Sequence, residues 1–194
     1  MFTFDVLKEK DPSLTFEAVD INGEPGAVFP AARMLEVAKR LRDEFGFTQL
    51  IDAFGIDRME RHGRFEITYT IRNHVSKERA FIKVRCEERT PHVPSLVEVW
   101  TGANWNEREA FDMFGVVFDG HPDLRRMYLP EEFEHHPLRK DFPMTGFVEV
   151  RYDDMEKRVV YEPVRLNQEF RQFDFLSPWE GAIPQQLPGD EKAS

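Results

Sequence analysis

Apolar and polar residues alternate along much of the first half of the chain, a pattern typical of strands that bury one face. The alternation is clearest from Phe65 to Ile71 and from Ala80 to Cys86. These two stretches flank the polar sequence 73–78, so we expect them to pair as a hairpin. Two further strands are predicted at 14–21 and 49–56, and a turn is predicted at 22–26.

A helix is predicted between the strands at 14–21 and 49–56, because apolar residues recur there at three- and four-residue spacing. They are Met34, Leu35, Ala38, Leu41 and Phe45. Gly46 follows at the position where the helix would end. The helix should therefore lay one apolar stripe against the sheet.

A second helix is predicted from Asn104 to Gly115. Asn104 can cap a helix N-terminus, and Glu107, three positions later, would complete a pair of the capping-box kind. Arg108 and Asp112 are four residues apart and could pair on one face of the helix. Gly115 can end the helix in the left-handed conformation.

This order of elements predicts an α+β domain over residues 1–115. We expect a two-layer sandwich in which a mostly antiparallel mixed sheet carries helices on one face. Residues 116–181 are expected to form a long extended arm, rich in proline and aromatic residues, with one hairpin near 147–162. Residues 182–194 are predicted to be a disordered tail.

The arm is expected to need a partner in order to become ordered. Eight of the 13 prolines lie from Pro122 onward, and periodicity is weak between Gly115 and Gly146. Aromatic side chains in this half favour burial, but an extended segment makes few contacts with itself that could offset the entropy of ordering it. We therefore expect the arm to lie across the surface of another protein.

The composition excludes several classes of function. The net charge is −10 and the pI is about 5.1, so nothing attracts the chain generally to nucleic acid or anionic lipid. Cys86 is the only cysteine, which excludes an internal disulfide and a cluster held by several cysteines. The chain has no apolar run of membrane-spanning length and no targeting pattern at its N-terminus. We expect no direct membrane insertion.

Two kinds of catalytic site can be drawn from the polar residues after residue 104. A metal site could use histidines and acids, which are His121, His135, His136, Asp112, Asp123, Glu131, Glu132 and Glu134. Their spacing fits no helical zinc motif, and His121 and His136 precede prolines, so local hydrogen bonds at turns are the simpler interpretation. Glu107, Glu109 and Asp112 could act as acid and base.

A structural ion-pair cluster is the alternative to the acid–base pair. Four arginines, Arg108, Arg125, Arg126 and Arg139, are numerous enough to neutralise these acids. The sequence contains no glycine-rich phosphate loop and no nucleophile-elbow motif. Cys86 lies within a predicted strand and is interpreted as a core residue. From the residues alone, the chain is expected to contain no catalytic, cofactor-binding or metal-binding centre.

Several motifs in order resemble a known family. The stretches 107–115 and 120–126 read Glu-Arg-Glu-x-x-Asp-Met-Phe-Gly and Gly-His-Pro-Asp-Leu-Arg-Arg. They are similar to the signature of the 30 kDa-type subunit of the proton-pumping NADH:quinone oxidoreductase, respiratory complex I. The resemblance continues through 136–143, 145–154, 158–163 and 173–181. His135 departs from the family, which usually has glycine there, and a positive φ at that position would strain a histidine.

The resemblance implies a structural subunit of the hydrophilic arm of that enzyme. FMN, iron–sulfur clusters and quinone would be bound by other subunits. The partners would be the quinone-site subunit, which lines the quinone cavity, and adjoining iron–sulfur subunits, in a hetero-oligomer. The chain would lie peripherally on the cytoplasmic face of the bacterial inner membrane, or on the matrix face of the mitochondrial one.

The resemblance also implies interface roles for the signature residues. Glu107, Arg108, Glu109, Asp112, His121, Asp123, Arg125, Arg126 and His136 belong to this set. Most of them would anchor the arm where it leaves the domain. Arg139, Lys140 and Asp141 would hold the arm further along, on the quinone-site subunit or a cluster-bearing neighbour.

Two other functions remain open from the sequence. The chain could be the equivalent component of an energy-converting membrane hydrogenase or a ferredoxin-dependent relative. A function of another class would be a metal-dependent enzyme that uses His121, His136 and nearby carboxylates.

Overall fold

The computed structural model describes residues 2–59, 63–86 and 90–168, which form parts of two compact units, 1–146 and 147–194. The motif at 173–181 and the predicted tail at 182–194 lie outside the described residues. The α+β class predicted from the sequence is confirmed.

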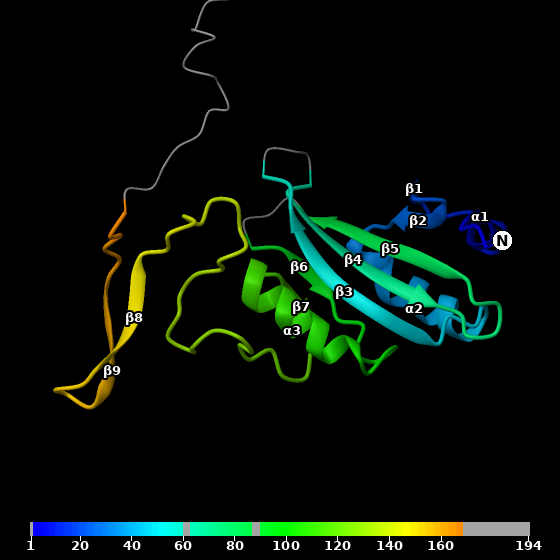
Figure 1. Ribbon diagram of the computed structural model, residues 1–194. Helices are drawn as coiled ribbons and strands as arrows, with labels where there is room; N and C mark the ends of the chain where they lie inside the picture. The colour runs from blue at the N-terminus through cyan, green and yellow to red at the C-terminus, as the bar shows by residue number, and fades with distance from the viewer. Residues whose placement is uncertain (1, 60–62, 87–89, 169–194) are drawn as a thin grey trace, which may run out of the picture. The chain divides into compact units, whose positions relative to one another are not determined.

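The first unit is built on a five-stranded sheet (Figure 1). The strands are β1 (Glu17–Ile21), β2 (Glu24–Val28), β3 (Gln49–Asp57), β4 (Phe65–Arg72) and β5 (Arg79–Cys86). Their order is β1-β2-β5-β4-β3, in which only the β2–β5 pair is parallel. The mixed, mostly antiparallel sheet and the β4–β5 hairpin are therefore as predicted.

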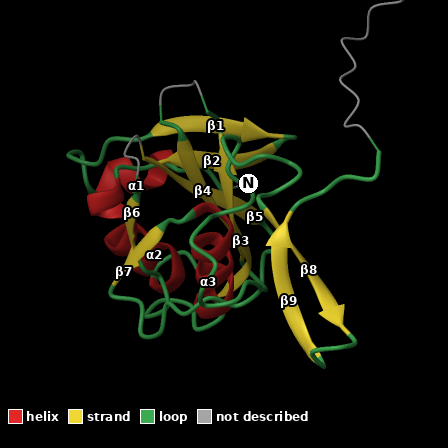
Figure 2. Cartoon of the chain, turned by 90° about the vertical axis from the view of Figure 1, so that its left-hand side faces the viewer, coloured by secondary structure: helices red, strands yellow, loops and turns green. Residues whose placement is uncertain are grey.

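The helices lie on one face of this sheet, as the predicted sandwich requires (Figure 1). They are α1 (Asp5–Lys10), α2 (Met34–Asp43), which follows a 3₁₀ turn η1 (Ala31–Arg33), and α3 (Ala103–Phe114). The apolar stripe of α2 and the inward side chains of β4 and β5 form one core, which includes Met34, Leu41, Tyr69, Ile71 and Ile82. Two short strands, β6 (His92–Pro94) and β7 (Val117–Asp119), pair in parallel beside the helices (Figure 2).

The predicted turn at 22–26 is shorter than expected. Only Asn22 and Gly23 turn, with φ of 56° and 84°, and β2 begins at Glu24. Pro25 is tolerated inside the strand because pairing with β5 starts one residue later, at Gly26. The local sequence 22–26 could not predict that Pro25 lies in a strand, because β5, which pairs with this strand, is more than 50 residues away.

The second unit contains the predicted hairpin. Its strands are β8 (Val148–Asp153) and β9 (Arg158–Pro163), which pair antiparallel from Val148 opposite Pro163 to Asp153 opposite Arg158. Lys157 adopts a φ of 53° at the turn. Within the described part of the chain, no helix has the length and apolar character needed to cross a membrane.

The first unit extends past the predicted domain boundary at residue 115. It continues to Gly146 because residues 121–142, which we call the strap, hydrogen-bond back to α3 and to β3. The predicted boundary rested on the expectation that this segment makes few contacts with its own domain. The contacts that contradict this expectation are those of the signature residues.

Candidate functional site: the charged residues around helix α3

Glu107 is a fully buried acid that points from α3 into the core. Its carboxylate accepts hydrogen bonds from the Ser95 hydroxyl at 2.6 Å, the Leu96 backbone N–H at 2.7 Å and the Tyr69 hydroxyl at 3.2 Å. Burial raises the pKa of Glu107 to about 7, although these three donors oppose the increase. The side chain thereby joins α3 to β4 and to the turn after β6.

The predicted capping box is wrong. The helix starts at Ala103, one residue before Asn104, and its N-cap residue Gly102 makes no side-chain cap hydrogen bond. Ala103, Glu107 and Ala110 are buried together on one stripe of the helix. Glu107 therefore faces the core, where it cannot reach back to the N-terminal N–H groups.

Asp112 is the second buried acid of α3, and it holds the strap. One oxygen, Oδ2, accepts the backbone N–H groups of Met127, Tyr128 and Leu129 at 3.0, 2.7 and 3.1 Å. The other, Oδ1, pairs with the Arg126 guanidinium at 2.7 Å. Burial would raise the pKa of Asp112, but these four donors together lower it. A single charged side chain thus fixes four consecutive residues of the strap.

The predicted Arg108–Asp112 pair is also wrong, because the oxygens of Asp112 are already occupied. Arg108 instead donates to the backbone carbonyls of Arg125, at 3.1 Å, and of Arg126, at 3.4 Å. Its guanidinium carbon lies 5.1 Å from the centre of the Trp105 ring. Arg108 therefore binds carbonyl groups of the strap, whereas the buried Asp112 binds its N–H groups.

His121 begins the strap with one local hydrogen bond, as the simpler interpretation predicted, and with a second one to Asn104, 17 residues away. Its Nδ1 accepts from the Asp123 N–H at 3.0 Å, so Nε2 carries the proton and donates to the Asn104 carbonyl at 3.2 Å. Asp123 and Arg125 form an exposed ion pair at 2.7 Å. Glu109 lies on α3.

His136 and Arg139 close the C-terminal end of α3, so the hydrogen bond of His136 is not the local one that was predicted. His136 Nδ1 donates to the Asp112 carbonyl at 3.0 Å, and Arg139 Nε donates to the Phe114 carbonyl at 2.5 Å. Burial, and then the nearby Arg139 and Arg126, lower the pKa of His136. Gly115 ends the helix with a φ of 70°, as predicted, and a Cβ there would collide with both side chains.

Lys140 and Asp141 end the strap on the sheet. The Lys140 N–H donates to Asp57 at 2.8 Å, and Asp141 pairs with Arg64 at 2.9 Å. Arg64 also binds Asp57 through two nitrogens, at 2.9 and 3.1 Å. Burial would raise the pKa of Asp57, but Arg64 and the N–H donors lower it to about 2. These contacts link the end of the strap to β3.

The three histidines of the hypothetical metal site do not converge. His135 has no positive φ, and its ring contacts Phe133 and Phe142, whereas His136 points to α3 and His121 to the start of that helix. No three His, Cys, Asp or Glu side chains within residues 2–59, 63–86 and 90–168 are grouped as a metal would require. The arrangement is an ion-pair and hydrogen-bond cluster. Cys86 is partly buried at the end of β5.

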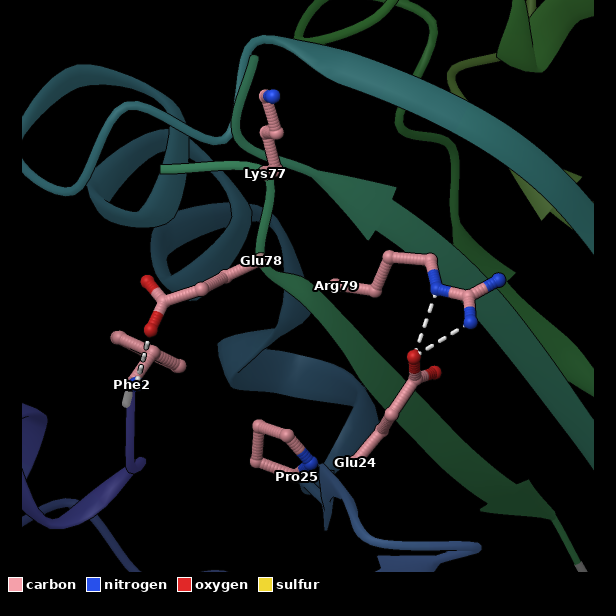
Figure 3. A pocket seen from close by; sticks show the side chains of 6 residues that line it. All are labelled: Phe2, Glu24, Pro25, Lys77, Glu78 and Arg79. Carbon is pink, nitrogen blue, oxygen red and sulfur yellow. Dashed lines mark hydrogen bonds and ion pairs between the residues drawn. The ribbon is translucent and has the colours of Figure 1, made fainter. Parts of the chain in front are cut away.

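A separate hollow lies near the N-terminus, against the turn between β4 and β5 (Figure 3). Its charged wall residues bind other parts of the chain: Arg79 pairs with Glu24 at 2.5 Å, and Glu78 accepts the Phe2 N–H at 2.9 Å. The first contact joins β5 to β2, and the second attaches the N-terminal segment to the β4–β5 turn. We assign no ligand to this hollow.

The sequence matches known proteins along most of its length. The model of the family "Respiratory-chain NADH dehydrogenase, 30 Kd subunit" matches residues 27–148. The C subunit of NADH-quinone oxidoreductase from Rhodopseudomonas palustris (strain TIE-1) is 56% identical over 165 residues, which are 84% of this chain and 80% of that protein. The Caulobacter vibrioides protein of the same name is 56% identical over 173 residues, covering 88% and 86%.

Two solved structures are also similar. The trypsin-resistant fragment (1-134) of Nqo5 has a TM-score of 0.55 and 32% identity, over 62% of this chain and 97% of that fragment. A chain of the archaeal membrane-bound sulfane sulfur reductase has a TM-score of 0.62 at 23% identity, covering 72% and 83%, a likeness of fold alone. The family match and the close relatives establish that this chain belongs to the family of the 30 kDa subunit of the respiratory-chain NADH dehydrogenase.

Proposed function

We propose that this chain is a non-catalytic structural subunit of the hydrophilic arm of NADH:quinone oxidoreductase. In this role it braces the quinone-site subunit, while other subunits bind FMN, iron–sulfur clusters and quinone. It thereby supports electron transfer from NADH to quinone and the coupled proton translocation. The names of relatives that are 54% to 56% identical support this enzyme rather than a hydrogenase.

The observation that carries the proposal is the way the two buried signature acids are occupied. An acid or base that takes part in a reaction must reach the reacting group. Glu107 and Asp112 have no exposed surface, and their oxygens accept hydrogen bonds from β4, the turn after β6 and the strap. They hold together the surface from which the chain continues toward its partners. This arrangement supports a structural role.

The strap supplies the rigid base that a brace needs. It is bound to α3 through Asp112 and to β3 through Asp57 before the chain leaves the first unit at Gly146. Residues from 147 onward then extend to the quinone-site subunit and to adjoining iron–sulfur subunits. The chain would be held peripherally at the cytoplasmic face of the bacterial inner membrane, or at the matrix face in mitochondria, by these neighbours.

Replacing Arg126 with alanine tests the proposal. The variant leaves the buried Asp112 carboxylate without its cation, at a cost of about 3 kcal/mol, so the strap should loosen. We expect the amount of assembled complex in native membranes to fall several-fold, with an unchanged NADH:quinone reductase rate per assembled complex. Arg125→Ala is the matched control, and it should assemble normally, since among the described residues the Arg125 side chain makes an exposed ion pair with Asp123.

A different pattern would contradict the structural role. If Arg126→Ala assembles fully but turns over slowly, the residue takes part in electron or proton transfer. Purification of the tagged protein from native membranes also addresses the related hydrogenase, since co-purifying flavin and NADH-oxidising activity would exclude it.

A further inference from the structure

The β8–β9 hairpin has one entirely apolar face. Cross-strand pairing places Val148 opposite Pro163, Val150 opposite Tyr161, and Tyr152 opposite Val159, and directly opposed residues share a face. All six side chains are exposed, and the five other than Pro163 are 51% to 63% exposed. Nothing in the described part of the second unit covers them.

The opposite face of the hairpin is charged and already paired. It carries Glu149, Arg151, Asp153, Arg158 and Glu162, together with one apolar residue, Val160. Arg151 binds Glu162 at 2.9 Å and Asp153 at 3.2 Å. Arg158 pairs with Glu156 at 2.5 Å, and Glu149 accepts the Arg165 N–H at 3.3 Å. The charged groups of this face therefore have partners within the second unit and can remain in contact with water.

A two-stranded hairpin with an uncovered apolar face is marginally stable at best in water. Its stability comes from burying that face against a third element. The two tyrosines lie diagonally across the strands, in the neighbouring pairs Tyr152–Val159 and Val150–Tyr161 of this face. Each tyrosine can bury about 200 Å² while its hydroxyl stays at the rim of a contact. The face therefore has the composition of an interface core.

We propose that the apolar face of the β8–β9 hairpin is a docking surface for an uncharged, apolar area on a larger protein subunit, while the charged face remains in water. The partner area must be uncharged because this face supplies no group that could neutralise a buried charge. The assignment of the partner to the same enzyme complex rests on the proposed function.

A second copy of this chain fits the surface less well. A stable interface buries about 800 Å² per partner, and the six side chains of the hairpin face fall short of that area. A larger partner protein can also contact the chain next to the hairpin, which would add to the buried area. The net charge of −10 also opposes self-association.

Adjacent valines on opposite faces provide a matched test. Val159 lies on the apolar face and Val160 on the charged face, where it is opposite Arg151. We expect Val159→Glu to reduce the fraction of the full-length chain retained in the complex purified from native membranes by about tenfold, because docking would bury an unpaired carboxylate. Val160→Glu should be retained like the wild type.

The outcomes separate this inference from the bracing role. Equal retention of the two valine variants would overturn the docking surface. So would a wild-type dimer in analytical ultracentrifugation that Val159→Glu dissociates, since the occupant would then be a second copy. A chain truncated after Gly146 tests the bracing role itself. If this truncated chain is lost from the complex while Val159→Glu is retained, the bracing role is supported and the docking face assigned to the hairpin is wrong.

Discussion

Two carboxylates on one helix show how burial and the surrounding donors together decide the charge of an acid. Glu107 receives three neutral donors, which do not compensate for burial, and its pKa rises to about 7. Asp112 receives three N–H groups and a guanidinium, and its pKa falls. Asp112 is therefore charged throughout the physiological range, whereas Glu107 titrates within it.

The stability of the protein should depend on pH through Glu107. Its pKa is about 7 when folded and 4.5 ordinarily, so its contribution is complete below pH 4.5 and is lost as the pH rises through 7. The difference corresponds to about 3 kcal/mol. Glu107→Gln cannot titrate, so its free energy of unfolding in urea should gain about that amount relative to the wild type between about pH 4.5 and pH 7.5. A difference that stays constant over this range would contradict the assignment.

At the scale of elements, the sequence predicts those helices and strands that have a local hydrophobic pattern. The β4–β5 hairpin depends on neighbouring residues and is found as predicted, although β4 also buries its polar face. The apolar stripe of α2 is found in part: Met34, Ala38 and Leu41 are buried, whereas Leu35 is partly buried and Phe45 lies beyond the end of the helix at Asp43. The short strands β6 and β7 pair across more than 20 residues and leave no local pattern. The sequence therefore does not predict them.

The roles of Glu107 and Asp112 could not be read from their spacing. A capping box and a core-facing position both place an acid three or four residues into a helix. The one signal that could have separated them is the buried stripe formed with Ala103 and Ala110. For Asp112, the donors lie 14 to 17 residues further along the chain, in a segment without periodicity.

The end of α3 should be sensitive to substitution at Gly115. Gly115→Ala combines a left-handed φ of 70° with collisions against His136 and Arg139. Gly120→Ala is the control, since Gly120 has a φ of 83° and no atom within 4 Å of the added Cβ. Both should lose about 1 kcal/mol to backbone strain. We expect Gly115→Ala to lose at least about 1 kcal/mol more in thermal unfolding. Equal losses of stability in the two variants would mean that His136 and Arg139 can move aside without a free-energy cost.

At the scale of the whole molecule, the strap belongs to the first compact unit, which continues to Gly146. The predicted arm starts at residue 116, but the carboxylates of Asp112 and Asp57 bind the strap within the first unit. The second unit, by contrast, has a hairpin whose apolar face is uncovered. Under the proposed function, the segment that docks on a partner therefore begins near Phe147.

Limited proteolysis of the isolated full-length chain with trypsin should locate this boundary. Exposed sites in the hairpin, Arg151, Lys157 and Arg158, are expected to be cut before Arg126 and Arg139 in the strap, because cleavage requires local unfolding and the strap is bound at both ends. Mass spectrometry of the early fragments identifies the sites. Asp112→Asn should expose the strap sites, since it weakens the pair that holds Arg126. Cleavage at Arg126 as fast as at Arg158 in the wild type would show that the strap, too, depends on a partner, and would move the boundary back to residue 115.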